Sequence, residues 1–296
     1  MNLFRGGDKP IVYDVAVIVP LYNEAQAIPT LLSELEDYLS DYQDKKIQVV
    51  FVDDGSTDES SEILSKHSFQ HFQPKLVRLS KNCGSHAALR AGIQHARAQY
   101  TTFLYADLQD PVHLIFDLYK KSAGAADIVW AFRKGNKSPF LEKCFSKLYA
   151  VLMRTFVTKR FPENGFDIVM FSEKVQRELN QNAEAHSSVF LQILQLGFRQ
   201  ESIEYDRRPR AEGKSKWTLA KKVKLLIDSF LSFSYAPIRF VSVMGVCMFL
   251  TGFAWSSYIV WRALAIGDLN QGWPTLIAVL MLGFGITNVS LGILAE

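Results

Sequence analysis

Residues 49–58 constrain the fold of this chain more than any other segment. Four apolar residues, Val49 to Val52, stop abruptly at Asp53 and Asp54, and a glycine, two hydroxyl residues and a third aspartate follow. A buried parallel strand reads as a continuous apolar run, and ligands of open α/β sheets gather beyond the carboxyl ends of such strands. The segment therefore predicts a strand with acidic side chains at a ligand-binding edge. The alternative is a plain strand end whose hydroxyl and acidic residues only cap the next helix.

Further apolar runs alternate with helical patterns along the chain. Strands are predicted over residues 15–19, 47–52, 76–79, 102–105 and 128–131, and helices over residues 28–39, 59–66 and 87–98. Such alternation of strand and helix is typical of a mostly parallel sheet wound with right-handed crossovers. We therefore expect an α/β domain over the first two thirds of the chain.

A second acidic strand end follows the run at 102–105. Asp107 and Gln109 stand two residues apart, so in an extended segment their side chains point the same way. A carboxylate and an amide oxygen suit Mg²⁺ or Mn²⁺, which commonly bind through one or two carboxylates plus substrate phosphates. The alternative is a turn, because Asp110 and Pro111 are residues that start helices. We expect Asp110 to cap that helix rather than bind metal.

Two long stretches near the C-terminus carry no charge. Residues 240–261 contain no charged side chain, and neither do residues 271–295. Each stretch is long enough to cross a bilayer, which takes about 20 apolar residues, so transmembrane helices are predicted at about 240–261 and 273–294. The alternative is a pair of buried core helices. Aromatic residues gather around the loop between the stretches, as in an interfacial belt: Trp255, Tyr258, Trp261 and Trp273.

The basic residues near these stretches predict an orientation. The segment before the first stretch is rich in them, with Lys214, Lys216, Lys221, Lys222, Lys224 and Arg239. The loop between the stretches offers only Arg262. By the positive-inside rule, the part before the spans faces the cytoplasm. The first residues do not resemble a secretory signal, because they are polar and the first apolar run is short.

Two amphipathic patterns lie outside the predicted sheet. Residues 219–233 place apolar side chains on one face and lysines on the other, as a helix at a membrane interface would. Residues 140–156 show a similar pattern. The alternative for both is a helix that covers the soluble core.

Charge and cysteine content argue against other classes of protein. The net charge is only +3, and no basic stripe alternates with exposed aromatic residues, so nucleic-acid binding is not indicated. The three cysteines lie far apart and lack the spacing of a zinc site or a disulfide framework. Self-association through the spans is compatible with the sequence.

Several motifs together carry a family pattern. They are Ile18-Val19-Pro20-Leu21-Tyr22-Asn23-Glu24, then Val52 to Asp58, then Asn82 with Gly84 and Ala87 to Gly92, then Ala106 to Pro111. In order and spacing they resemble family 2 glycosyltransferases with the GT-A fold. The segment Arg210 to Lys216, followed by two spans, is similar to the polyprenyl-phosphate glycosyltransferases. That group contains dolichyl-phosphate mannose synthases and bacterial undecaprenyl-phosphate glucosyl and aminoarabinosyl transferases.

The resemblance implies a domain organisation and a set of site residues. It implies a cytoplasmic catalytic domain over 1–212, a basic loop and interfacial helix over 213–237, and a two-helix transmembrane domain over 238–296. The residues implied for nucleotide-sugar binding are Pro20, Tyr22, Glu24, Asp53, Asp54 and Ser56. Those implied for phosphate binding are Arg133, Arg210 and Lys216. Asp107 and Gln109 would hold the divalent cation, and Asp107 and Asp167 would be catalytic.

The chain departs from the family pattern at two places. Many members read Asp-Ala-Asp-Leu-Gln, whereas this chain has Tyr105 at the first position. Many members also carry Gly-Asp-Phe-Arg, whereas this chain has Gly165-Phe166-Asp167-Ile168, which shifts the acid by one place and removes the arginine.

The implied activity is inverting transfer of a sugar from a UDP- or GDP-linked donor to undecaprenyl or dolichyl phosphate, at the bacterial inner membrane. One alternative is a processive polysaccharide synthase, which is disfavoured because two spans offer little channel and no Gln-x-x-Arg-Trp-like motif is present. Another is a non-catalytic, membrane-tethered binder of nucleotide sugars. Only Tyr105 and the altered 165–168 segment favour that binder.

Overall fold

The computed structural model describes residues 12–124, 126–134, 147, 150–155, 158–159, 161–162, 167–182, 188–208, 236–266 and 272–295. The predicted helix at 219–233 and the predicted phosphate-binding residues Arg210 and Lys216 lie outside these residues, as does most of the pattern at 140–156. The chain divides into two compact units, Met1–Asp228 and Ser229–Glu296.

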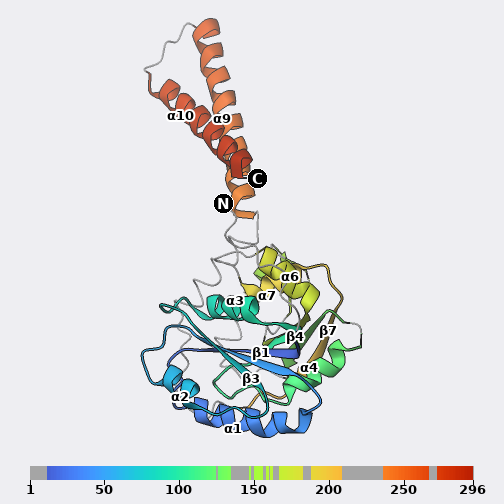
Figure 1. Cartoon of the computed structure of the whole chain (residues 1–296). Coiled ribbons are helices and arrows are strands. Elements are labelled where there is room, and N and C mark those ends of the chain that lie inside the picture. The colour runs from blue at the N-terminus through green and yellow to red at the C-terminus, as the bar shows by residue number, and fades with distance from the viewer. Residues whose placement is uncertain are drawn as a thin grey trace. The chain divides into compact units, whose positions relative to one another are not determined.

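A seven-stranded sheet in the order β3-β2-β1-β4-β6-β5-β7 forms the centre of the first unit (Figure 1). The strands are β1 (Tyr13–Leu21), β2 (Ile47–Asp53), β3 (Gln73–Arg78), β4 (Ala98–Phe103), β5 (Ile128–Arg133), β6 (Ile168–Ser172) and β7 (Gln200–Tyr205). Only β6 runs antiparallel to its neighbours among these strands. All the remaining strands therefore end at the edge of the sheet where β6 begins. The predicted mostly parallel α/β sheet is confirmed.

Helices cover both faces of the sheet (Figure 1). Those of this unit are α1 (Ile28–Leu39), α2 (Ser60–Lys66), α3 (Ser85–His95), α4 (Leu114–Ser122), α6 (Glu173–Gln181) and α7 (Val189–Gln195), with a short 3₁₀ turn at Ser40–Tyr42. Val17 and Val19 of β1 pack in one core with α1 and α4, whereas Ile18 between them points at Gly92 of α3. This alternation follows from the period of two along a strand.

Two predicted strands are displaced and two strands were not predicted. The strand expected at 76–79 is β3, which begins at Gln73, and the one expected at 102–105 is β4, which ends at Phe103. The start of β4 was not predicted because it is polar in sequence; Thr101 and Thr102 are buried, and their hydroxyls donate to the Gln176 side chain and the Val169 carbonyl. No pattern in the sequence predicted β6 or β7.

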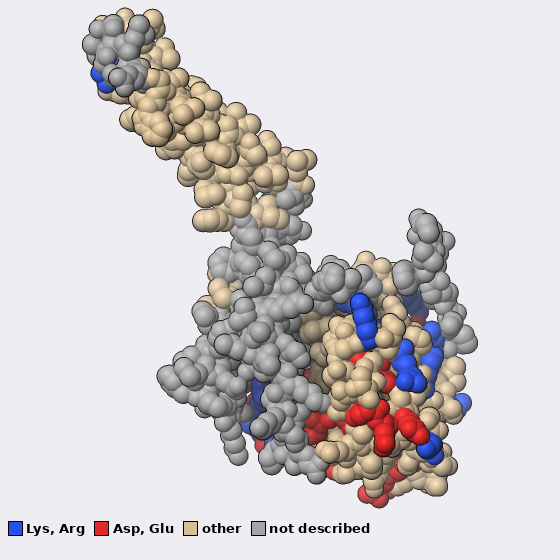
Figure 2. Space-filling model, turned by 90° about the vertical axis from the view of Figure 1, so that its left-hand side faces the viewer, with Lys and Arg blue, Asp and Glu red and all other residues tan. Residues whose placement is uncertain are grey.

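The second unit is a pair of helices, α9 (Ala236–Ile266) and α10 (Trp273–Ala295). Both are long and apolar enough to cross a membrane, and only 11% and 17% of their most apolar windows are buried. In Figure 2 the surface of this pair is almost free of charged side chains, whereas the first unit displays both signs. Helices buried in a soluble core would not leave such a surface, so the unit indicates membrane association.

Candidate functional site

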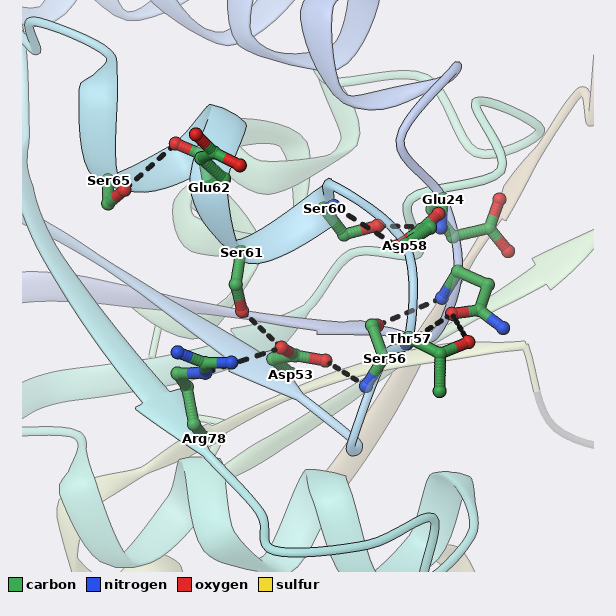
Figure 3. A network of polar contacts seen from close by, with 11 residues as sticks. Glu24, Asp53, Ser56, Thr57, Asp58, Ser60, Ser61, Glu62, Ser65 and Arg78 are labelled. Atoms are coloured by element: carbon green, nitrogen blue, oxygen red, sulfur yellow. Dashed lines mark hydrogen bonds and ion pairs between the residues drawn. The ribbon is translucent and has the colours of Figure 1, made fainter.

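The loops that follow β1 and β2 are joined by reciprocal hydrogen bonds (Figure 3). The backbone N–H of Asn23 donates to Ser56 Oγ at 3.0 Å, and the Asn23 side-chain oxygen accepts the N–H of Thr57 at 2.8 Å. The backbone N–H of Glu24 donates to Ser60 Oγ at 2.9 Å. The hydroxyl and amide residues of both motifs therefore hold the two strand exits side by side.

Asp53 lies at the centre of this arrangement. Its side chain is almost fully buried, and Oδ1 accepts the backbone N–H of Ser56 at 2.8 Å. Oδ2 accepts the hydroxyl of Ser61 and lies 3.8 Å from Nε of Arg78, at the end of β3 (Figure 3). The carboxylate thus organises the turn after β2 and orients a cationic side chain beside it.

Asp54 ties the same edge to the start of α3. Its two oxygens accept the backbone N–H groups of Cys83 at 2.7 Å and Gly84 at 2.9 Å. Its own N–H donates to the carbonyl of Leu21 at 2.9 Å. Burial raises the pKa of the Asp54 carboxyl, although both backbone hydrogen bonds act in the opposite direction. Asp54 therefore joins the exits of β1 and β2 to the turn before α3.

The residues predicted to bind a nucleotide sugar come together here. Pro20 is half-buried in β1, Tyr22 and Glu24 follow that strand, and Asp53, Asp54 and Ser56 follow β2 beside it. The structure thus assembles the predicted set at one edge of the sheet. Contact of this set with a nucleotide stays a prediction.

The segment after β4 is a turn rather than the extended segment that the sequence predicted. Leu108 has a left-handed φ of 59°, and the backbone N–H of Gln109 donates to Asp107 Oδ1 at 3.3 Å. The side chains of Asp107 and Gln109 are half-buried. The turn presents them at the edge where β1, β2 and β4 end.

Asp110 does not cap a helix as expected. Helix α4 begins at Leu114, and its N-cap residue is His113. Asp110 is buried, and Oδ1 accepts the hydroxyl of Tyr205 at 2.6 Å and lies 3.3 Å from Nε of Arg207. Burial raises the pKa of the Asp110 carboxyl, against the attraction of Arg207.

The chain that leaves β7 is thereby fastened to the turn after β4. Besides the contacts of Tyr205 and Arg207, the backbone N–H of Arg208 donates to the carbonyl of Gln109 at 2.9 Å. The sequence did not predict any of these three residues as part of the site. The only signal was the basic character of the run that begins at Arg207, because the hydrogen bond between Tyr205 and Asp110 spans 95 positions.

Asp167 reaches the same edge because β6 is antiparallel. It immediately precedes β6, whose start lies beside the end of β5. The backbone N–H of Arg133 donates to Asp167 Oδ2 at 3.1 Å, and Nε of Arg133 lies 3.6 Å from Oδ1. The structure thus joins the predicted catalytic acid to the predicted phosphate-binding arginine.

The donor set for a divalent cation is small. Within the part of the chain that the structure describes, no group of three or more histidine, cysteine or acidic residues is arranged to hold a metal ion. Asp107 and Gln109 offer one carboxylate and one amide oxygen. These hard oxygen donors fit Mg²⁺ or Mn²⁺ when substrate phosphates and water supply the other ligands.

Comparisons with known proteins are consistent with this site. The family model described as "Glycosyl transferase family 2" matches residues 16–205. "Uncharacterized glycosyltransferase YkcC" of Bacillus subtilis is 30% identical over 95% of this chain and 87% of its own length. "Undecaprenyl-phosphate 4-deoxy-4-formamido-L-arabinose transferase" of Edwardsiella ictaluri is 30% identical over 98% of this chain and 90% of its own. "Bactoprenol glucosyl transferase" of Shigella phage SfV is 27% identical over 95% and 92%.

Proposed function

The chain belongs to glycosyl transferase family 2 and is a glycosyltransferase, and from this premise we propose that it transfers a sugar from a nucleotide-sugar donor to a polyprenyl phosphate. The observation that carries the proposal is the combination of two features in one chain. A sheet edge lined with carboxylates and arginines suits a nucleotide diphosphate, and two apolar helices with exposed outer surfaces suit a lipid-borne acceptor. The names of the relatives from Edwardsiella ictaluri and Shigella phage SfV support the same acceptor class.

The reaction is a single displacement at the anomeric carbon. An oxygen of the lipid phosphate forms the new bond to that carbon, the bond to the donor diphosphate breaks, and the nucleoside diphosphate leaves from the opposite face with inversion. A phosphate monoester is already anionic near neutral pH, because its second pKa is about 6, so no strong base is needed. Asp167, held by Arg133, orients the acceptor phosphate or accepts its residual proton.

The main chemical difficulty is negative charge on the leaving group. Asp107 and Gln109 would hold Mg²⁺ or Mn²⁺, which when bound stabilises the charge that develops on the leaving diphosphate. Arg133 adds positive charge from β5, and the proposed roles of Arg210 and Lys216 are the same. The residues at the exits of β1 and β2 would bind the nucleoside, either uridine or guanosine.

The proposal includes a place in the cell. The catalytic domain over 1–212 would face the cytoplasm at the bacterial inner membrane, where nucleotide sugars are made. Residues 213–237 would lie at the interface, and residues 238–296 would span the bilayer. The lipid then delivers its phosphate from the membrane while the donor arrives from water.

The test is transfer by membranes that contain the full chain. They are incubated with labelled UDP-glucose, UDP-N-acetylglucosamine or GDP-mannose and undecaprenyl phosphate, with and without Mg²⁺. One donor is expected to give a product that is extracted by organic solvent, is labile in mild acid and is lost with EDTA. Asp107→Asn is expected to lower the rate at least about 100-fold, whereas Asp44→Asn, at an exposed aspartate, is expected to leave it unchanged. No labelled lipid with any donor or cation would contradict the proposal.

A further inference from the structure

Arg207 has more hydrogen-bond donors than the protein satisfies. Its side chain is 28% exposed, but Nε is buried and has no hydrogen-bond partner. The nearest carboxylate oxygen, Oδ1 of Asp110, lies 3.3 Å from Nε and already accepts the short hydrogen bond from Tyr205. A guanidinium carries five N–H donors in a rigid fork. Among the described residues, no side chain or carbonyl accepts a hydrogen bond from this fork.

A buried donor without an acceptor is rare in a native protein, and an ordered water, a bound ion or a functional role commonly explains it. The position of Arg207 in the fold favours an anionic ligand as the missing acceptor. Arg207 follows β7 by two residues and contacts the segment after β4, so it lies at the edge that carries Asp107. Burial by itself would lower the pKa of Arg207, but the carboxylates of Asp110, Asp167 and Asp107 raise it. The guanidinium is therefore permanently charged.

The charge balance at this edge also requires cations. The negative charges of Asp107, Asp110 and Asp167 all raise the pKa of Arg207. The phosphates of the substrates proposed above bring further negative charge to the same edge. Arg133 lies against Asp167, with its own Nε buried and without a hydrogen-bond partner. Two arginines thus present unsatisfied donors among carboxylates that would otherwise repel a phosphate. Arg133 is already a predicted phosphate ligand, whereas Arg207 is not.

We propose that Arg207 binds a phosphate oxygen of a substrate, while Asp110 and Tyr205 hold its guanidinium at the sheet edge. That the ligand is a substrate phosphate rests on the proposed function, in which two phosphate groups of the same chemistry reach this edge. One is the diphosphate of the nucleotide, and the other is the monophosphate of the lipid. The competing explanation is that Arg207 only neutralises the buried Asp110.

Two binding measurements on the full chain in detergent separate these sources. Isothermal titration calorimetry measures the affinity for UDP and for GDP with Mg²⁺, and native mass spectrometry measures occupancy by undecaprenyl phosphate. Arg207→Met is expected to weaken one of these ligands by roughly ten- to a hundredfold, the range for a lost hydrogen bond between charged groups. A weaker nucleotide assigns Arg207 to the donor, and a weaker lipid assigns it to the acceptor. The control is Arg177→Met, which removes an exposed arginine paired with Glu173 on α6.

A double variant tests the competing explanation and covers the risk that Arg207→Met does not fold. Asp110→Asn with Arg207→Met removes both charges, so it leaves no buried carboxylate unpaired. Phosphate binding predicts that the double variant folds and still binds the same ligand more weakly than the wild type does. Recovery of wild-type affinity in the double variant, or unchanged affinity for both ligands in Arg207→Met, would overturn the proposal. Because both measurements report binding, they answer the question even if no sugar transfer is found.

Discussion

At the scale of single residues, substitutions at three glycines distinguish the effect of backbone strain from that of steric contact. Gly55 has a φ of 71°, and an added Cβ would lie 2.5 Å from the backbone carbon of Lys81. Gly84 has a φ of 94°, but its added Cβ would meet nothing within 4 Å. Gly197 has neither restriction. An alanine would therefore meet both backbone strain and steric overlap at Gly55, backbone strain alone at Gly84, and neither at Gly197.

We expect alanine substitutions to destabilise the protein in that order. A positive φ costs about 1–3 kcal/mol for alanine, and steric overlap with a backbone adds about 1–3 kcal/mol. Gly55→Ala should thus cost about 2–6 kcal/mol, Gly84→Ala about 1–3 kcal/mol, and Gly197→Ala less than about 0.5 kcal/mol. Thermal melting of the full chain in detergent measures the order. Equal melting temperatures for Gly55→Ala and Gly197→Ala would contradict the turn geometry after β2.

Asp110 predicts a pH dependence of stability. Burial raises the pKa of its carboxyl above the ordinary value of 3.8, so the folded state binds a proton more readily than the unfolded state. Burying the ionised Asp110 carboxylate lowers the free energy of unfolding at pH values above its folded-state pKa. This destabilisation decreases as the pH falls through the folded-state pKa toward 3.8. The wild type should therefore gain stability relative to Asp110→Asn as the pH is lowered from 7 toward 4. Melting temperatures of both proteins at each pH test this, and a gain for the variant on acidification would refute the assignment.

At the scale of elements, the sequence predicted the strands that its local pattern could encode. β1, β2 and β5 are runs of apolar residues buried on both faces, and each was predicted close to its position. β3 and β7 are edge strands in which exposed polar residues dilute the pattern. β6 is apolar but short, and only its pairing between β4 and β5 reveals that it runs antiparallel. Its direction decides that Asp167 belongs to the site.

The two C-terminal helices give a second test at this scale. A Cβ added at Gly285 of α10 would lie 2.6 Å from the backbone nitrogen of Phe249 in α9, whereas one added at Gly283 would meet nothing within 4 Å. Close approach of small residues is the usual basis of helix packing in membranes. Gly285→Ala should therefore separate the helices and lower the melting temperature in detergent by several degrees, a loss of about 1–3 kcal/mol.

The control for this test is Gly283→Ala, two residues away on the same helix. Alanine is favoured over glycine in a helix interior by up to about 1 kcal/mol, so this variant should be neutral or slightly stabilised. A destabilisation of equal size at both positions would show that the loss at Gly285 does not come from contact with α9.

At the scale of the whole molecule, the site combines features that a linear sequence encodes with others that it does not. Asp53 and Asp54 could be predicted because they stand at the end of the apolar strand β2, and Asp107 because it follows the end of β4 by four residues. The contacts of Asp110 with Tyr205 and Arg207 could not, because they depend on β7 pairing with β5 and on the chain then reaching across to the turn after β4. Long-range strand pairing therefore brings Arg207 to this edge, although no motif in the sequence predicted it.

The predicted orientation of the chain in a membrane is the last consequence to test. Basic residues are concentrated before the first predicted span, whereas Arg262 is the only one near its far end, so the positive-inside rule predicts that the first unit faces the cytoplasm and that the loop between α9 and α10 lies outside. In a variant lacking native cysteines, Gly272→Cys should react with a membrane-impermeant maleimide in intact bacterial spheroplasts, because it lies at the loop end of α10. Asp44→Cys, on the exposed surface of the first unit, should react only after lysis. The reverse pattern would put the sheet edge on the side of the membrane that lacks nucleotide sugars, and the proposed donor would then be excluded.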